Sequence, residues 1–304
     1  MIVKECGVET DARQRQLKAF GSPQFPVYCS DVDMDTMDVP WHWHDELELD
    51  VPVSGKIRLS VDGREWILEP GEGMFLNTGV VHGIWPASSE HCRLHAIVFH
   101  PRLVGGSPES VYWQDYLKPL LSGAMPACFL GRDEAWQQEV LEQFHSAWQS
   151  CLTEERGFEF NVRGALSRLV FLLTEHRPAL EKRPSEKSLR DMARIKTMLQ
   201  FIQVHYSQPL TAAQIAQSAA ISESECLRCF RNVIGTTPIQ YLNQYRIQRA
   251  EELLLSTDWK ITEIGGQCGF QEMGWFARTF RKLKGCTPSE YRKRNEETGP
   301  DIKS

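Results

Sequence analysis

The chain has 304 residues, of which 41% are hydrophobic, and its 34 basic and 40 acidic side chains give a formal net charge of −6 at pH 7. That length allows two hydrophobic cores, while charged residues replace the apolar run of a signal peptide at the start and no apolar stretch is long enough to span a bilayer. With nine cysteines expected to be reduced thiols, the composition excludes secreted and membrane classes and predicts a cytoplasmic protein.

The first informative segment places two histidines and a glutamate close together. His42-Trp43-His44 is followed by Glu48 and then by Gly55. Side chains alternate along a strand, so His42, His44 and Glu48 are expected on one face of a strand pair. Residues 56–61 and 64–68 are predicted strands joined at Asp62-Gly63, the signal of a two-residue hairpin. Gly71, Asn77, Gly79 and His82 then follow as Gly-x5-Asn-x-Gly-x2-His.

With these two motifs, residues 25–100 resemble a cupin, a small jelly-roll barrel. The resemblance implies that His42, His44, Glu48 and His82 occupy the metal-ligand positions of metal-bearing cupins, and such ligands suit iron, manganese, nickel or zinc. Asn77 stands where that family usually has proline. Three interpretations remain open: a bound divalent metal, a metal-free effector pocket with no cofactor, and a packed interior in which the histidines satisfy one another.

A pocket in a barrel combines apolar walls with a few polar groups. Tryptophan faces stack on sugars and on aromatic acids alike, so the effector class stays open between a sugar and an aromatic or other organic acid. Trp66 is expected to be structural. The expected effector-binding residues are His42, His44, Glu48, Trp43, His82, Trp85 and His95.

Residues 109–176 carry apolar stripes at helical spacing. The stripes begin with Val111 and Tyr112, continue through Trp136 to Trp148, and end with Phe160 to Leu173. Such helices could bury one another within a monomer or form a dimer seam. The polar, proline-containing run that follows, residues 177–188, is predicted to be an interdomain linker.

Near the C-terminus one pattern occurs twice. Residues 228–241 and 278–291 both spell Arg-x-Phe-Arg-x-x-x-Gly-x-Thr-Pro-x-x-Tyr, at an offset of 50 residues. In each copy a helix is expected to end at a glycine, Gly235 or Gly285. The next helix begins with a capping box, at Thr237 or Thr287.

A short helix and a tight turn precede each copy. The helices are predicted at residues 211–216 and 261–265, and Ser222 with Glu225 forms a further predicted capping box. Helix, turn and helix form the helix-turn-helix arrangement, whose second helix enters the DNA major groove. Residues 239–255 are predicted to form one continuous helix that joins the two units.

On these motifs, residues 195–292 resemble the DNA-binding domain of the AraC/XylS family of bacterial transcription regulators. The resemblance implies double-stranded DNA and RNA polymerase as partners, a homodimer, and activation, since most family members are activators. Gly265 stands where the family usually has alanine, which predicts a less stable second unit.

Charge supports this interpretation, because residues 188–294 contain 15 basic and 9 acidic side chains in a chain that is acidic overall. In the first unit Ser224 and Arg228 are the expected base contacts and Arg231 the expected phosphate contact. In the second, Phe276, Phe280 and Leu283 are expected to face inward. The residues expected to face DNA there are Met273, Arg278, Lys282 and Lys284, and the resemblance implies base contacts at Met273, Gly274, Ala277 and Arg278.

The predicted fold class is therefore α+β with two domains: an N-terminal β-barrel of the cupin or jelly-roll type with added helices, and a C-terminal all-α domain with two helix-turn-helix units. The predicted ranges are 1–108 for the barrel, 109–176 for the helical segment, 177–188 for the linker, 189–294 for the DNA-binding domain and 295–304 for a polar tail. The predicted function is transcription regulation without enzymatic activity. Two alternatives are a metal-dependent cupin enzyme fused to a DNA-binding domain, and a barrel that serves only for dimerisation.

Overall fold

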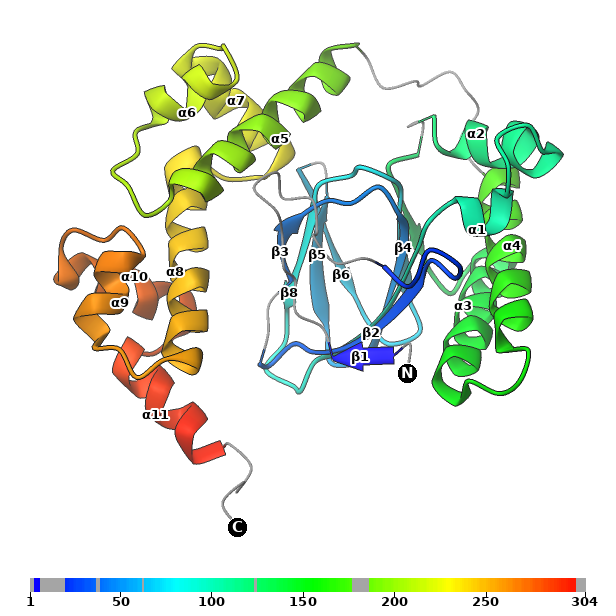
Figure 1. Cartoon of the computed structure of the whole chain (residues 1–304), viewed down its shortest axis with the longest axis horizontal. Coiled ribbons are helices and arrows are strands. Elements are labelled where there is room, and N and C mark those ends of the chain that lie inside the picture. Colours follow the sequence, from blue (N-terminus) through cyan, green and yellow to red (C-terminus); the bar gives the residue numbers. More distant parts are fainter. Residues whose placement is uncertain are drawn as a thin grey trace. The chain divides into compact units, whose positions relative to one another are not determined.

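A computed structural model of the chain describes residues 3–5, 20–36, 39–61, 63–122, 125–176 and 186–298. The chain divides into two compact units, residues 1–193 and 194–304. The first contains two β-sheets with helices, and every element described in the second is a helix (Figure 1). The predicted α+β class with an all-helical C-terminal part is confirmed.

Ten strands among the described residues form the two sheets of the first unit. The six-stranded sheet has the order β1 (Val3–Glu5), β2 (Val27–Asp33), β9 (Arg93–Phe99), β4 (Leu47–Ser54), β7 (Gly73–Leu76) and β10 (Ala127–Leu130). The four-stranded sheet has the order β3 (Val39–His42), β8 (His82–Pro86), β5 (Ile57–Val61) and β6 (Arg64–Leu68). The predicted hairpin is the β5–β6 pair, and Gly63 in its turn has a φ of 70°, as a tight hairpin turn requires.

The two sheets share one hydrophobic core. Val32, Met74 and Leu94 of the six-stranded sheet lie in the same buried cluster as Ile57, Leu59 and Ile84 of the four-stranded sheet. The described strands thus form two sheets packed face to face, which is the arrangement that the predicted jelly-roll takes in this chain.

Helices cover the other face of the six-stranded sheet. These are α1 (Arg102–Gly105), the π-helix η1 (Tyr112–Leu117), α2 (Lys118–Leu120), α3 (Ala135–Thr153) and α4 (Phe158–Glu175). Leu49, Phe75 and Ile97 of the sheet share a buried cluster with Phe144 of α3 and Leu169 of α4. The six-stranded sheet is therefore buried on both faces, and most of the apolar stripe residues are used within the monomer.

The helical segment departs from a uniform pattern of packed helices in two places. Val111, Tyr112 and Phe160 of the apolar stripes are 54%, 58% and 81% exposed, so the alternative of a dimer seam stays open for these side chains. The segment also contains a strand, because Ala127–Leu130 pairs with β7 at the edge of the sheet. Such a short apolar run takes its conformation from the strand edge that it meets, not from its own periodicity.

Asn77, the departure from the usual cupin pattern, has a structural role. Its buried side-chain amide donates hydrogen bonds to the carbonyl oxygens of Leu120 and Met125, over 2.7 and 3.0 Å, and its Oδ1 accepts from the backbone N–H of Thr78. Its own backbone N–H donates to Pro126. Asn77 thereby attaches the loop before β10 to the end of β7.

The second unit is built around one long helix. Figure 1 shows α6 (Ala212–Ser218) and α7 (Glu223–Val233) at one end of α8 (Pro238–Ser256), with α9 (Ile261–Gln267), α10 (Met273–Lys284) and α11 (Pro288–Thr298) at the other. The predicted connecting helix over residues 239–255 is therefore confirmed as α8. At 1.5 Å per residue, its 19 residues span roughly 28 Å.

The helix that enters this unit, α5 (Glu186–His205), begins inside the predicted linker. Residues 186–188 of that prediction are helical, and residues 177–185 lie outside the described part of the chain. At the other end, α11 continues to Thr298, so the first four residues of the predicted polar tail are also helical. Residues 299–304 lie outside the described part.

Most predicted helix ends are confirmed. Thr237 and Thr287 each accept a hydrogen bond from the backbone three residues on, and Gln240 and Glu290 return one. Gly235 and Gly285 adopt left-handed conformations with φ of 75° and 74°. At Ser222 only half of the predicted box forms.

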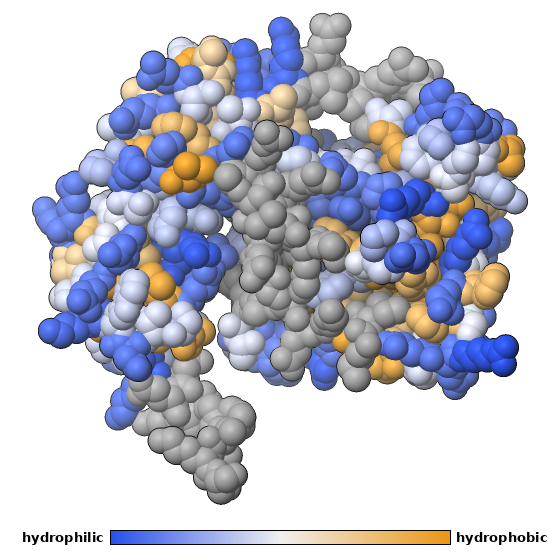
Figure 2. All heavy atoms as spheres, in the orientation of Figure 1, coloured by the Kyte–Doolittle hydropathy of each residue, from blue (hydrophilic) through white to orange (hydrophobic). Residues whose placement is uncertain are grey.

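Figure 2 shows a largely hydrophilic face interrupted by small hydrophobic patches. Within the ranges that the structure describes, no helix combines the length and apolar character needed to cross a bilayer.

Candidate functional site

The two cupin motifs bring three imidazoles and one carboxylate together between the sheets. His42 and His82 are partners in the β3–β8 pairing, and Glu48 lies on β4. One potential ligand atom from each of His42, His44, Glu48 and His82 lies within 4.8 Å of the others. All four residues are at most 5% exposed. The structure thus assembles the predicted quartet at a buried position.

Backbone carbonyl groups fix the orientation of all three rings. Nδ1 of His42, His44 and His82 lies 2.9, 3.2 and 2.9 Å from the carbonyl oxygens of Pro40, Glu46 and Val80. A carbonyl oxygen can only accept, so Nδ1 carries a hydrogen in each ring and Nε2 is left as a bare lone pair whenever the ring is neutral.

The Nε2 atoms of two rings meet one carboxylate oxygen. Oε2 of Glu48 lies 2.7 Å from Nε2 of His44 and 3.0 Å from Nε2 of His82, although the second contact lacks hydrogen-bond geometry. A lone pair on Nε2 repels the carboxylate oxygen that it faces unless a proton or a cation lies between the two atoms. Burial lowers the pKa of His44, but the hydrogen bond and charge of Glu48 outweigh it and the net pKa is raised.

The pKa values of the neighbouring His42 and Glu48 are both lowered, for different reasons. Burial, followed by the charge of His82, holds the pKa of His42 well below its usual value. Burial alone would raise the pKa of Glu48, but the adjacent histidines lower it well below the ordinary range. His42 is therefore a neutral ring and Glu48 an anion, which are the forms in which both bind metal ions.

The donor set fits a divalent transition metal. Three Nε2 lone pairs and one carboxylate oxygen come from separate strands and loops, and the carbonyl groups behind Nδ1 act as the outer partners that orient metal-binding histidines. The same groups also form a stable pair of protonated His44 and ionised Glu48, so the geometry serves both a metal site and a metal-free polar pocket.

Three of the predicted effector-binding residues do not join this site. The side chain of Ile84 faces the interior, so that of the next residue, Trp85, points to the outer face of the four-stranded sheet. There the ring of Trp85 packs against that of Trp41, with 5.4 Å between the centroids. His95 alternates with interior residues on β9 and stacks on Trp148 of α3 at 3.8 Å. Trp43 is half-buried and does not line the interior cavity described next.

A small cavity adjoins the quartet and contains a residue that the sequence did not indicate. It is lined by His42, Glu48 and Asp50 together with apolar side chains from both sheets. Asp50 follows Glu48 by two positions on β4 and so shares its face. That spacing was the available signal, but an aspartate in a strand is normally expected at the surface.

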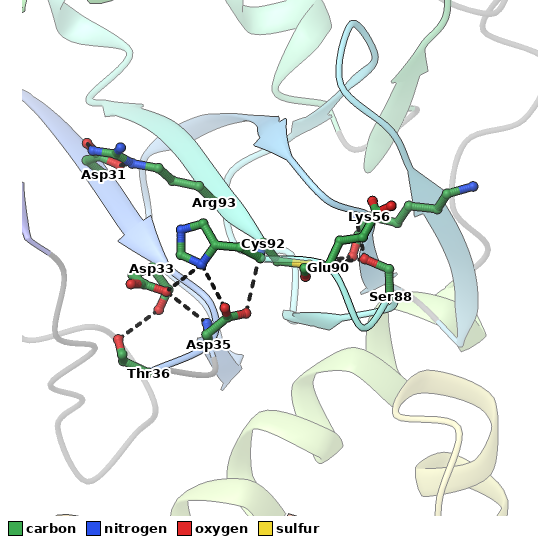
Figure 3. Close-up of polar contacts among 10 residues, drawn as sticks. Asp31, Asp33, Asp35, Thr36, Lys56, Ser88, Glu90, Cys92 and Arg93 are labelled. Carbon is green, nitrogen blue, oxygen red and sulfur yellow. Dashed lines mark hydrogen bonds and ion pairs between the residues drawn. The ribbon is translucent and has the colours of Figure 1, made fainter. Parts of the chain in front are cut away.

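A second group of acidic residues lies at the surface (Figure 3). Asp33, Asp35 and His91 are close enough to hold an ion but all are exposed. Nδ1 of His91 pairs with Asp35 at 2.7 Å, and Arg93 binds Asp31 through two contacts. These groups satisfy one another and tie the loop before β9 to the end of β2.

In the first helix-turn-helix, the predicted DNA contacts differ in their exposure and in whether an ion pair within the protein holds them. Ser224 and Arg231 on α7 are exposed. Arg228 is only about one third exposed, and its guanidinium lies 3.4 Å from Glu225, which also binds Arg194 at 2.7 Å. This pairing explains the incomplete capping box at Ser222, because the Glu225 carboxylate is used elsewhere.

In the second helix-turn-helix, Arg278 and Lys282 on α10 are exposed and have no ion-pair partner among the described residues. Lys284 instead pairs with Glu251 of α8 at 2.9 Å. Met273 packs against the core of the unit, and Leu283, expected to face inward, is 39% exposed. Arg278 and Lys282 are therefore the free cations of this helix among its predicted contacts.

One buried cation joins separate parts of the helical C-terminal unit, residues 194–304. Arg246 of α8 is 3% exposed and donates hydrogen bonds of 2.8 Å to the carbonyl oxygens of Tyr206 and Gln208. Its guanidinium also lies over the ring of Phe270, 5.7 Å from the centroid. Arg246 thereby joins the loop after α5 to the turn of the second helix-turn-helix.

Comparisons with known proteins agree with both parts of this picture. Residues 24–159 match the family described as AraC-like ligand binding domain, and residues 215–294 match a family of helix-turn-helix domains. The HTH-type transcriptional regulator YdeC of Bacillus subtilis is 26% identical, over 94% of this chain and 98% of that protein. The arabinose operon regulatory protein of Salmonella typhimurium is 26% identical over 80% and 82% of the two chains. The melibiose operon regulatory protein of Escherichia coli is 24% identical over 84% of each.

Proposed function

Because this chain belongs to the AraC family of transcriptional regulators, we propose that its N-terminal unit binds a small effector which changes how its C-terminal unit occupies promoter DNA. The effector must bind one arrangement of the protein more tightly than the other, since equal affinity for both would shift nothing. Activation through RNA polymerase is the proposed outcome.

The observation that supports this proposal most is the duplicated helix-turn-helix with free cations on both second helices. Arg231 on α7 and Arg278 on α10 are exposed, whereas Arg228 and Lys284 are held in ion pairs within the protein. An exposed arginine on a recognition helix can bind a guanine edge through two hydrogen bonds. We therefore propose Arg278 as the principal base-reading residue and Arg231 as a phosphate contact.

Genome-wide footprinting of the purified protein tests this function, because it finds the bound promoters and the operator sequence in a single experiment. We expect protected sites that cover two successive major grooves on one side of the duplex. Arg278→Ala should weaken binding by about 1 to 3 kcal/mol and relax specificity at one base pair. Normal footprints by this variant on the same sites would refute the assignment, and the absence of any protected site would refute the function.

A divalent metal at the histidine quartet is a second proposal. When bound, such an ion would supply an open coordination position for an effector. Metal analysis of the purified protein is the direct measurement, with His44→Ala as the variant and the exposed His176→Ala as its control. Stoichiometric iron or manganese lost only in His44→Ala would support the site and would reopen the alternative of a cupin enzyme fused to a DNA-binding domain.

We also propose that the protein acts as a homodimer. Phe160 near the start of α4 is 81% exposed, and Leu152 near the end of α3 is 52% exposed, which is unusual for large apolar side chains. Sedimentation of the wild-type protein and of Phe160→Ser should show weaker self-association in the variant. A wild-type protein that sediments as a monomer at all concentrations would contradict the dimer.

A further inference from the structure

A cleft on the outside of the N-terminal unit has the size of a small-molecule site. It lies between the loop before β2, helix α1 and the start of α4, and its volume is about 480 Å³. Small-molecule sites typically measure about 300–1,000 Å³. The cavity beside the histidine quartet is only about 20 Å³, which is room for one water-sized group. Of these two cavities, only the outer one admits an effector of several carbon atoms without a rearrangement of the sheets.

Contacts within the unit hold the walls of this cleft in place. Helix α1 packs against α4 (Figure 1). Arg102 of α1 donates a hydrogen bond of 3.1 Å to the carbonyl oxygen of Pro23 in the loop. In the same loop, the ring of Phe25 packs edge-on against that of Phe158 at the start of α4, with 5.6 Å between the centroids. All three segments are thus joined to one another, and the cleft is formed before any ligand arrives, as small-molecule sites usually are.

Part of the lining is apolar and poorly covered. Phe25 and Leu103 of the lining are half-buried, whereas Phe160 is 81% exposed. Covering an exposed phenylalanine is favourable in proportion to the apolar area that is removed from water. Aromatic rings also attract one another in stacked and edge-on arrangements. A ligand that carries an aromatic ring would therefore gain from contact with this wall.

The charged groups of the cleft favour an anion. Two guanidinium groups, of Arg102 and Arg163, line it together with one carboxylate, that of Glu159. All three residues are exposed, and none of them has an ion-pair partner among the described residues. An arginine without a counter-ion can bind a carboxylate through two parallel hydrogen bonds. A neutral sugar would gain little from this excess of positive charge, and a cation would be repelled by it.

We propose that the cleft binds the carboxylate form of a small aromatic acid, with Arg163 as its principal counter-ion. One N–H group of Arg102 is already used by Pro23, so Arg102 contributes mainly its charge and the position of the loop. The ring of the ligand lies against the apolar wall. This inference rests on the proposed effector function of the N-terminal unit, and of the two effector classes left open by the sequence it selects the acid.

Calorimetric titration of the full-length protein with phenylacetate tests this assignment. Benzyl alcohol lacks the charge, acetate and inorganic phosphate lack the ring, and cyclohexanecarboxylate has a ring that is not aromatic. We expect phenylacetate to bind at least about tenfold more tightly than the first three compounds. It should bind about two- to tenfold more tightly than cyclohexanecarboxylate. Equal affinity for phenylacetate and any of these four compounds would overturn the assignment.

Three variants place the ligand in the cleft. Arg163→Gln should weaken phenylacetate binding by about tenfold or more. Arg156→Gln is the matched control, because Arg156 is exposed in the loop before α4 but does not line the cleft, and its affinity should stay within about twofold of wild type. Glu159→Gln removes the one carboxylate and should strengthen binding by about 1.5- to 5-fold. Unchanged affinity in Arg163→Gln or weaker binding by Glu159→Gln would each contradict the proposal.

A second copy of the chain is the competing occupant, because Phe160 is also the residue that we propose for self-association. Sedimentation of Arg163→Gln distinguishes the two occupants. If the cleft holds a second copy, none of the titrants binds and Arg163→Gln weakens self-association, a result that would overturn the ligand. Thermal unfolding of the variants serves as the check on folding, and since all three replaced residues are exposed we expect wild-type values.

The outcome is separable from that of the proposed function. Footprinting of the same preparation reports DNA binding whether or not phenylacetate binds. Phenylacetate binding without any protected promoter would leave the ligand assignment standing and remove the regulatory function. Protected promoters in a protein that binds none of the titrants would remove the ligand assignment alone.

Discussion

Ala220 adopts a backbone conformation that alanine rarely takes. Its φ is 53°, and it lies exposed in the turn between α6 and α7. The equivalent turn between α9 and α10 has Gly269 with a φ of 82°. The same hydrogen bond closes both turns, from Ile221 to Ala216 over 3.2 Å and from Phe270 to Gly265 over 2.9 Å. The two turns thus share one hydrogen-bond pattern, but the left-handed backbone conformation is less favourable for Ala220 than for Gly269.

Replacing Ala220 with glycine should therefore stabilise the protein. The left-handed conformation costs an alanine about 1 to 2 kcal/mol, of which the greater chain entropy of glycine offsets part. We expect Ala220→Gly to raise the free energy of unfolding by about 0.5 to 1 kcal/mol in urea denaturation. The reverse change, Gly269→Ala, should lower it, since a Cβ there would lie 2.5 Å from the carbonyl oxygen of Tyr206. A loss of stability in Ala220→Gly would contradict this account.

Asn77 gives a second prediction about a single side chain. Asn77→Asp removes both amide donors and leaves the carbonyl oxygens of Leu120 and Met125 facing a carboxylate. Unsatisfied buried acceptors cost about 1 to 3 kcal/mol, so chemical denaturation should show a loss of that order. The exposed Asn161→Asp is the matched control and should stay close to wild type. Equal stability of the two variants would mean that the loop before β10 does not depend on Asn77.

Helix α9 contains two adjacent glycines that the structure distinguishes. A Cβ at Gly265 would lie 2.9 Å from both Met273 and Phe276, whereas a Cβ at Gly266 would meet nothing within 4 Å. Gly265 therefore permits the close approach of α9 and α10, and Gly266 only weakens the helix.

Alanine substitutions should separate these two roles. Gly266→Ala should stabilise the protein by up to about 1 kcal/mol through helix propensity. Gly265→Ala should gain less or lose stability, because Met273 must move to admit the new methyl group. Urea denaturation of both variants provides the measurement. A larger gain from Gly265→Ala than from Gly266→Ala would show that α9 and α10 are not in close contact there.

Elements with strong local signals were predictable from the sequence. Capping residues and terminal glycines located α8 and α10, and Asp62-Gly63 located the β5–β6 hairpin. Strand β10 was not predictable, since its four residues become a strand only by pairing with β7. The face of His95 was predictable, because Arg93 and His95 alternate with the apolar Leu94 and Ala96 on β9 and therefore share the face that points away from the interior site.

The interior site was predictable only in part, because its lining comes from strands that are far apart in sequence. The quartet follows from its spacing, but the enclosure of Asp50 could not be recognised, because it depends on neighbours on β9 and β2. Conversely, Trp85 lies close to His82 along the chain and still faces the other side of its sheet. Residues close together in sequence lie on the same strand, but side-chain alternation decides which of them face the site.

Charge is divided unequally along the whole chain, and this governs how the protein should respond to salt. Residues 188–294 are basic within a chain of net charge −6, so phosphate binding depends on a small number of unpaired cations. Each phosphate contact contributes about 0.9 to the slope of log affinity against log salt concentration. Arg231→Ala and Lys282→Ala should each reduce that slope by about this amount, measured between about 50 and 200 mM salt. Lys284→Ala should leave it unchanged, because Glu251 already neutralises Lys284. If Lys284→Ala lowers the slope as much as Lys282→Ala does, the ion pair with Glu251 must break when DNA binds.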